Sequence, residues 1–177
     1  MTDTKPTVPY PNTFWVLPGV FLAGEHPGDL DKDLALAKLN SLLDAGIRTF
    51  VDLTEEHELK GYHKLLRTLA ENRRIDITSL RIPIPDRTVG SARTLRCILN
   101  VIDSSLADQN AAFVHCFAGI GRTGTVVGCY LKRHGLAKQA DVLAKIADLR
   151  RLMPVGRESS PHTPEQTRMV EHWMEGV

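Results

Sequence analysis

Residues 115–125, HCFAGIGRTGT, carry most of the side chains whose types and spacing could do chemistry. Cys116 and Arg122 stand six positions apart in this segment, between a predicted buried strand and a predicted helix. Backbone N–H groups in such a turn, together with the N-terminus of the helix behind it, favour a bound anion. Gly119 and Gly121 allow the tight curvature that such a turn needs. The segment therefore predicts an anion-binding loop.

Arg122 and Cys116 give this loop a more specific chemistry. The planar guanidinium of Arg122 can bind two oxygens of one phosphate group. The same positive environment favours the thiolate form of Cys116, which is the nucleophilic form of a cysteine. We therefore expect an ionised nucleophile beneath a phosphate cradle, and the cradle residues are Phe117, Ala118, Gly119, Ile120, Gly121 and Arg122.

Other kinds of chemistry find no support in the sequence. Cys97 and Cys129 lie in predicted helices, where we interpret each as a small buried hydrophobic residue. Three cysteines do not make a disulfide framework and fit a reducing cytosol. The sequence contains no Walker-type GxxxxGK[ST] loop, no HExxH and no CxxC, so we expect no metal and no cofactor.

Length and composition indicate one folded domain. The chain has 177 residues, of which 42% are hydrophobic and 24% charged. A net charge of +1 provides no overall basic field for nucleic acid or an anionic membrane. The sequence shows neither the apolar core of a signal peptide nor an apolar run that could span a bilayer. We expect a cytoplasmic monomer, with an extended arm over residues 1–12 and a single catalytic domain over 13–177.

The elements that must position the loop alternate between strands and helices. Strands are predicted at residues 14–23 (two short strands around a Pro-Gly turn), 47–53, 77–84 and 111–116. Helices are predicted at residues 31–45, 58–72, 92–107, 122–134, 138–152 and 164–175, with Ser91 as the cap of the third. This alternation predicts an α/β domain, with a central, mostly parallel sheet of about four or five strands and helices on both faces.

The pattern H-C-x5-R-T resembles the signature of cysteine-dependent protein tyrosine and dual-specificity phosphatases. The likeness covers nearly the whole chain from about residue 12, and several segments look like the small atypical, VHZ type of dual-specificity phosphatase: 14–24, 46–56, 81–86, 115–125 and 161–173. It implies a phosphotyrosine-phosphatase-like fold and a metal-independent phosphomonoester hydrolase.

The resemblance also implies roles for single residues of the loop. Cys116 would attack phosphorus and form a cysteinyl-phosphate intermediate. Arg122 and the backbone of residues 117–122 would hold the equatorial oxygens. The hydroxyl group of Thr123 would stabilise the departing thiolate, and His115 would set the shape of the loop from behind.

A general acid is expected on a loop that precedes the nucleophile. Asp86 follows the strand 77–84 in the sequence Ile84-Pro85-Asp86, at the place where tyrosine-specific members of the family carry Trp-Pro-Asp. The alternative is an ordinary turn aspartate after proline. Asp52 and Asp103 are poorer candidates, because they fall within a predicted strand and a predicted helix.

Residues 160–166, SPHTPEQ, resemble the family's glutamine loop, in which Gln166 would position the hydrolytic water. The same spacing is a capping box with Pro164 at the first helical position, and this alternative explains it completely. Both interpretations stay open, and Glu165 is a second candidate for the water. Glu55 and Glu56 either brace Arg122 or are solvent-exposed acids, which is the interpretation we favour.

The variable positions of the loop bear on the substrate. Phe117, Ala118 and Ile120 are not basic, whereas phosphoinositide phosphatases of this superfamily tend to carry lysines there. We therefore expect a protein phosphatase that acts on phosphotyrosine in a protein or peptide, with phosphoserine and phosphothreonine as further substrates. A non-protein ester (an inositol phosphate, a lipid or an RNA 5′ phosphate) is an alternative, as is a low-activity phosphate-binding scaffold. Three arginines near the acid loop could draw an acidic peptide, although surface arginines are usually just solvated: Arg81, Arg87 and Arg93.

Overall fold

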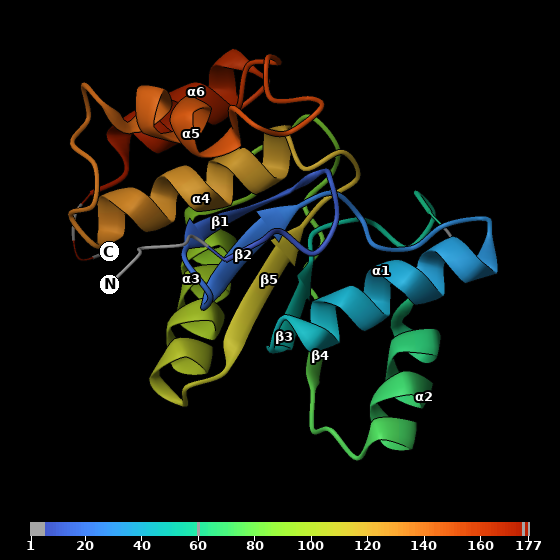
Figure 1. Ribbon diagram of the computed structural model, residues 1–177. Helices are drawn as coiled ribbons and strands as arrows, with labels where there is room; N and C mark the ends of the chain where they lie inside the picture. Colours follow the sequence, from blue (N-terminus) through green and yellow to red (C-terminus); the bar gives the residue numbers. More distant parts are fainter. Residues whose placement is uncertain (1–5, 60, 175, 177) are drawn as a thin grey trace.

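A five-stranded sheet lies between two layers of helices in the computed structural model, which describes residues 6–59, 61–174 and 176 (Figure 1). The strands are β1 (Thr13–Leu17), β2 (Phe21–Gly24), β3 (Ile47–Asp52), β4 (Thr78–Arg81) and β5 (Ala111–His115). Their order across the sheet is β1-β2-β5-β3-β4, and only β1 runs antiparallel to its neighbour. The predicted fold class is confirmed.

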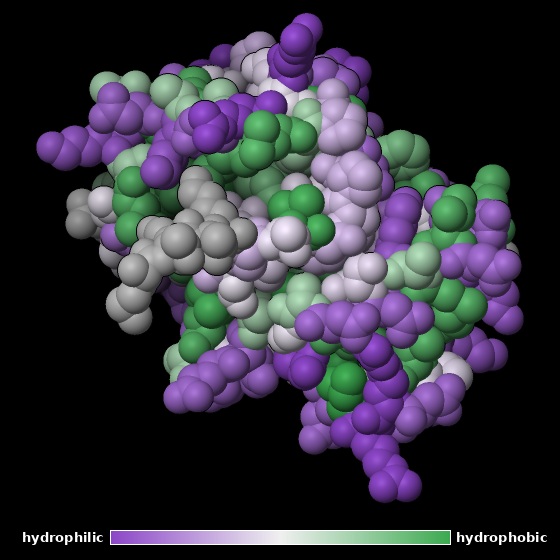
Figure 2. All heavy atoms as spheres, in the orientation of Figure 1, coloured by the Kyte–Doolittle hydropathy of each residue, from purple (hydrophilic) through white to green (hydrophobic). Residues whose placement is uncertain are grey.

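The helices divide between the two faces of the sheet. The first layer holds α1 (Lys32–Asp44) and α2 (His63–Arg73). The second layer holds α3 (Ala92–Ala107), α4 (Gly121–Arg133), α5 (Val142–Arg150) and α6 (Pro164–His172) (Figure 1). Figure 2 shows polar and apolar residues mixed in small patches on the surface, as expected when each helix turns its apolar side inward.

The central strand β5 is buried along its whole length because helices cover both of its faces. Its side chains alternate between the two layers. Ala112 and Val114 belong to the core beneath α3–α6, and Ala111 and Phe113 belong to the core beneath α1 and α2. The strand therefore delivers His115 and Cys116 to a fixed place at the carboxyl edge of the sheet.

Several predicted boundaries are wrong, and the local chemistry explains them. The helix predicted at 58–72 begins only at His63, and residues 56–58 form a turn. The strand predicted at 77–84 ends at Arg81, because its partner β3 ends at Asp52, the residue opposite Arg81. The helix predicted at 138–152 begins at Val142, and the last helix ends at His172, while Glu175 lies outside the described residues. The cap is confirmed: Ser91 Oγ accepts from Thr94 N at 3.0 Å.

The described part of the arm contacts the domain through Tyr10. Its side chain is buried against Phe113, and its hydroxyl group donates to the carbonyl of Glu25 at 2.7 Å. The division of the chain at residue 12 stays a prediction.

Close packing behind the loop depends on Gly128 of α4. A Cβ at this position would lie 2.5 Å from Val170 Cγ1 of α6 and 3.1 Å from Ile146 Cδ1 of α5. Both neighbours are buried, so neither can move aside without disturbing the core.

We therefore expect Gly128→Ala to lower the free energy of unfolding by about 1–2 kcal/mol, because overpacking outweighs the better helix propensity of alanine. Chemical denaturation would measure the change. In a Val170→Ala background the same substitution should cost less, because the two methyl groups it meets are gone. Equal costs in both backgrounds would contradict the packing argument.

Candidate active site

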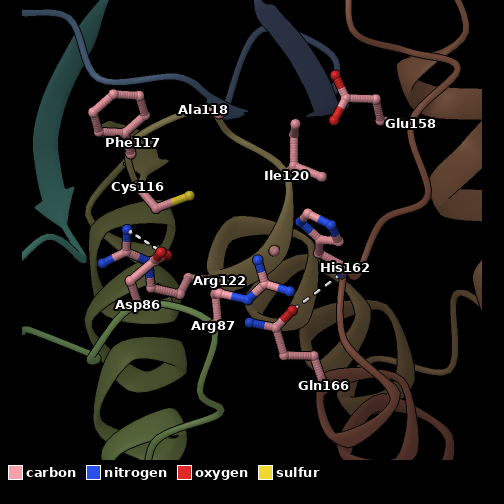
Figure 3. A pocket seen from close by; sticks show the side chains of 11 residues that line it. Asp86, Arg87, Cys116, Phe117, Ala118, Ile120, Arg122, Glu158, His162 and Gln166 are labelled. Carbon is pink, nitrogen blue, oxygen red and sulfur yellow. Dashed lines mark hydrogen bonds and ion pairs between the residues drawn. The ribbon is translucent and has the colours of Figure 1, made fainter.

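Cys116 lies at the start of the turn that joins β5 to α4, at the carboxyl edge of the parallel strands. Open α/β sheets generally bind their ligands at this edge. Cys116 is 3% exposed and borders a cavity of about 240 Å³ (Figure 3). The cavity is lined by Asp86, Arg87, Cys116, Phe117, Ala118, Ile120, Gly121, Arg122, Glu158, His162 and Gln166. The structure thus brings together the predicted cradle, nucleophile, acid and glutamine, which come from distant parts of the chain.

The turn is held tightly against its surroundings. Gly119 has φ +71°, and a Cβ there would overlap the carbonyl group of Gly24 at the end of β2. The backbone N–H of His26 donates to the carbonyl of Phe117 at 3.0 Å, and Ser160 Oγ donates to the carbonyl of Ile120 at 2.7 Å. The curvature that orients the loop's N–H groups is therefore fixed from two sides.

Arg122 is a buried cation with partners on both of its Nη atoms. Its guanidinium is 2% exposed and forms a bidentate pair with Glu58, at 2.6 and 2.7 Å. Nη1 also donates to the carbonyl of Ile84 at 3.0 Å, and more weakly to that of Leu53 at 3.4 Å. Burial alone would lower the pKa of Arg122, but the hydrogen bonds and charge of Glu58 outweigh it and raise that pKa. In the same way, burial would raise the pKa of Glu58, but the bond to Arg122 holds it below its usual value.

Glu58 is the residue that the sequence analysis missed. It braces Arg122, whereas Glu55 and Glu56, which were weighed for this role, do not form the pair. Glu58 belongs to the same acidic run, EEHE, as Glu55 and Glu56, and this run was the signal that could have identified it as a candidate. Because the sequence analysis placed residue 58 in a helix over 58–72, a contact between this residue and Arg122 was not expected.

Asp86 faces Cys116 across the cavity, and its Oδ1 lies 3.2 Å from Arg122 Nη2 (Figure 3). Its side chain is 65% exposed, so it remains accessible from solvent. The loop that carries it turns sharply, because Thr88 N donates to the carbonyl of Pro85 at 3.1 Å.

A buried polar layer supports the loop from beneath. Tyr62 shares a hydrogen bond of 2.8 Å with His115 Nε2, and His115 Nδ1 lies 3.2 Å from the carbonyl of Cys116. Complete burial lowers the pKa of His115 to about 3, so its ring is neutral near pH 7. A neutral ring that donates through Nδ1 must accept through Nε2 from the hydroxyl group of Tyr62. This geometry agrees with the predicted place of His115 behind the loop.

Asp52 closes this layer at the end of β3, level with His115 in the sheet. It accepts from the backbone and hydroxyl group of Thr54, at 2.8 and 2.6 Å, and contacts His63 at 2.8 Å and Arg81 at 3.1 Å. Burial would raise the pKa of Asp52, but these bonds outweigh it and hold that pKa well below its usual value. Asp52 is thus a buried, satisfied anion and not a proton donor for the cavity.

Gln166 forms the capping box, and its role in positioning the hydrolytic water stays a prediction. Its backbone N–H donates to Thr163 Oγ1 at 3.2 Å, and its Oε1 accepts from the N–H groups of His162 and Thr163, so the capping box is present. Its Nε2 donates to the carbonyl of Thr88 at 2.9 Å, which ties α6 to the acid loop. The buried side chain also lines the cavity, whereas Glu165 is exposed.

Of the remaining residues singled out in the sequence, Thr123 and Cys129 are buried and Cys97 is exposed. Thr123 is buried, and its hydroxyl group donates to the carbonyl of Gly24 at 3.5 Å. Cys129 is buried as expected, and burial raises the pKa of its thiol. The prediction for Cys97 is wrong, because this residue is exposed on the side of α3 away from the stripe that contacts the sheet.

Within the described residues 6–59, 61–174 and 176, no group of three or more His, Cys, Asp and Glu residues is placed to hold a metal ion. None of their helices has the length and apolar character needed to cross a bilayer.

Comparison with known proteins gives the family. A family model described as the DSP-PTPase phosphatase of polymorphic toxin systems matches residues 31–136, which include Asp86, Cys116 and Arg122. The chain belongs to this phosphatase family. The phosphatase is 25% identical over 172 residues to the human dual specificity protein phosphatase CDC14A, an alignment that covers 92% of the chain and 26% of the relative. It is also 33% identical over 95 residues to Arabidopsis thaliana PTEN1, named a phosphatidylinositol 3,4,5-trisphosphate 3-phosphatase and protein-tyrosine-phosphatase, over 52% of the chain and 22% of the relative.

Solved structures share the fold of the phosphatase. The active form of Tk-PTP matches with a TM-score of 0.69 at 24% identity, over 95% of this chain and 99% of the other. PTPMT1 in complex with PI(5)P also has a TM-score of 0.69, at 20% identity, over 92% of this chain and 94% of the other. The phosphatase spans about a quarter of the length of the curated relative CDC14A. The dual-specificity superfamily is confirmed, and the VHZ type stays a prediction.

The brace on Arg122 can be tested with a matched pair of variants. We expect Glu58→Gln to lower kcat/KM for an aryl phosphate by up to about a hundredfold, because the guanidinium loses the charge that fixes it. Glu56→Gln is the control, since it makes the same chemical change at an exposed neighbour. Steady-state kinetics, with circular dichroism to confirm folding, would measure both. Equal activity of the two variants would contradict a brace at Glu58.

Proposed function

We propose that the phosphatase hydrolyses phosphotyrosine in proteins or peptides through a cysteinyl-phosphate intermediate, and that phosphoserine and phosphothreonine are further substrates. The observation that carries this proposal is the arrangement of Cys116, Arg122 and Asp86 around one cavity. The protein would act as a cytoplasmic monomer, and its reaction would need no metal ion and no cofactor.

In the first step, the thiolate of Cys116 attacks phosphorus and the bond between phosphorus and the substrate oxygen breaks. The N–H groups of the loop and the fork of Arg122 hold the equatorial oxygens where charge develops. Asp86, in its protonated form, gives its proton to the leaving oxygen. General acids of this kind contribute about 10²–10⁴-fold to a rate.

In the second step, water attacks phosphorus and the bond between sulfur and phosphorus breaks. Asp86, now ionised, takes a proton from the water, and Gln166 orients that water from the α6 side of the cavity. The departing thiolate receives a hydrogen bond from the hydroxyl group of Thr123. Inorganic phosphate leaves, and Asp86 and Cys116 return to their starting forms.

The walls of the cavity support an aryl substrate with one phosphate. Phe117, Ala118 and Ile120 form an apolar side, and the ring of Phe117 is 54% exposed beside Cys116. A phenol ring gains from such contacts. The similarity to PTPMT1 bound to PI(5)P and to PTEN1 favours a phosphoinositide as the second candidate.

A substrate panel decides between these candidates. We expect a phosphotyrosine peptide to have a higher kcat/KM than a phosphoserine peptide or a short-chain phosphoinositide, with the same rate in the presence of a chelator. Preference for the phosphoinositide would replace the proposal by the second candidate.

The nucleophile can be tested by removing the sulfur. We expect Cys116→Ser to abolish turnover and still bind phosphate, because the serine hydroxyl stays protonated while the cradle is intact. Cys97→Ser, the same change at an exposed thiol outside the cavity, should keep wild-type activity. Calorimetry with phosphate, alongside kinetics, separates the two effects. Turnover by Cys116→Ser would rule out catalysis through this residue.

The role of Asp86 can be tested with a series of leaving groups. A phenol of pKa about 10 needs a proton during bond cleavage, whereas a more acidic phenol leaves readily as its anion. We therefore expect Asp86→Asn to slow hydrolysis strongly for poor leaving groups and weakly for good ones. The dependence of kcat on the pKa of the leaving phenol measures this. An equal loss for every substrate would mean that another residue is the acid.

A further inference from the structure

We propose that Arg87 is a specificity-determining residue that binds an acidic side chain next to the phosphorylated residue. The preferred substrates would then be phosphotyrosine peptides with Asp or Glu beside the phosphotyrosine. This inference deepens the proposed function and rests on it.

Arg87 occupies a turn position at which arginine is an unusual residue type. Arg87 has φ +62° and is the third residue of the turn closed by Thr88 N and the carbonyl of Pro85. Turns with a positive φ at this position favour Gly or Asn, which adopt it at little steric cost. Arg74 and Gln109 also have positive φ, but neither lines the cavity, so Arg87 combines this conformation with a place beside Cys116.

The guanidinium of Arg87 is available to a ligand. It lines the same cavity as Cys116, and none of the ion pairs among the described residues involves it. In contrast, Arg81 is paired with Asp52, and Arg122 is paired with Glu58. Figure 3 shows Arg87 extending toward Gln166, while Asp86, its neighbour in sequence, turns toward Arg122. The turn therefore directs the carboxyl group of Asp86 toward Arg122 and the unpaired guanidinium of Arg87 toward the mouth of the cavity.

The charges on the other walls favour a carboxylate of a peptide over a second phosphate of a lipid. Glu158 lines the cavity, and its side chain is likewise in no ion pair of the described residues. It would repel a second, doubly charged phosphate more strongly than the single charge of a carboxylate. The cradle positions Phe117 and Ile120 add no cation for such a group. A peptide can extend across the mouth, so that its single carboxylate lies at Arg87 and away from Glu158.

The test compares two phosphotyrosine peptides that differ only in having Asp or Asn beside the phosphotyrosine. For the wild type we expect kcat/KM to favour the Asp peptide about three- to fivefold, the effect of one exposed ion pair. This ratio should shrink as ionic strength rises. Arg87→Gln and Arg87→Gly should both bring the ratio to about one, and the Gly variant does so without strain in the turn. Arg93→Gln, at an exposed arginine outside the cavity, is the control and should keep the wild-type ratio.

Two kinds of failure are distinguishable. Equal kcat/KM for both peptides in the wild type, or a preference that survives in both Arg87 variants, would overturn the role of Arg87 and leave the phosphotyrosine activity intact. Hydrolysis of an aryl phosphate but of neither peptide would overturn the proposed function itself. Faster hydrolysis of a phosphoinositide, lost in Arg87→Gln but not in Arg93→Gln, would show that Arg87 binds a lipid phosphate and would also reject the proposal.

Discussion

The architecture of the site depends on one buried charge, the guanidinium of Arg122. Removing a cation from water is costly unless fixed partners replace the solvent, and breaking a buried pair leaves that cost uncompensated. Glu58 supplies the counter-charge, and carbonyl groups from the segments after β3 and β4 accept from Nη1 as well. Arg122 therefore joins the end of β3, the acid loop and the start of α4 into one unit, and this unit also places Asp86 opposite Cys116.

Beneath this cation lies a buried polar layer that keeps the loop in shape. His115 is neutral because it is fully buried, and it connects Tyr62 to the backbone of Cys116. Asp52 keeps its negative charge through its own hydrogen bonds at the end of β3. The hydrogen-bond donors that a phosphate requires thus come from Arg122 and from the backbone N–H groups of the loop.

The sequence predicts the parts of the site that are local, and it misses those that depend on the order of the sheet. The H-C-x5-R-T pattern locates the loop, and the position of Asp86 after β4 locates the acid loop. Glu58 was missed because its contact with Arg122 requires β3 beside β5, which no local pattern encodes, and because Leu59 and Tyr62 continue the periodicity of α2. Cys97 was wrongly predicted to be buried. The sequence pattern itself indicates exposure, because Cys97 falls outside the apolar stripe formed by Leu95, Ile98 and Ile102.

The central claim is that phosphorus is bonded to the sulfur of Cys116 during turnover. Rapid acid quench of the enzyme during hydrolysis of an aryl phosphate, followed by peptide mass spectrometry, tests it directly. We expect one added phosphoryl group, on the peptide that contains Cys116, and its loss when substrate is exhausted. Steady turnover with no phosphorylated enzyme at any quench time, or with the phosphoryl group on a different residue, would contradict it.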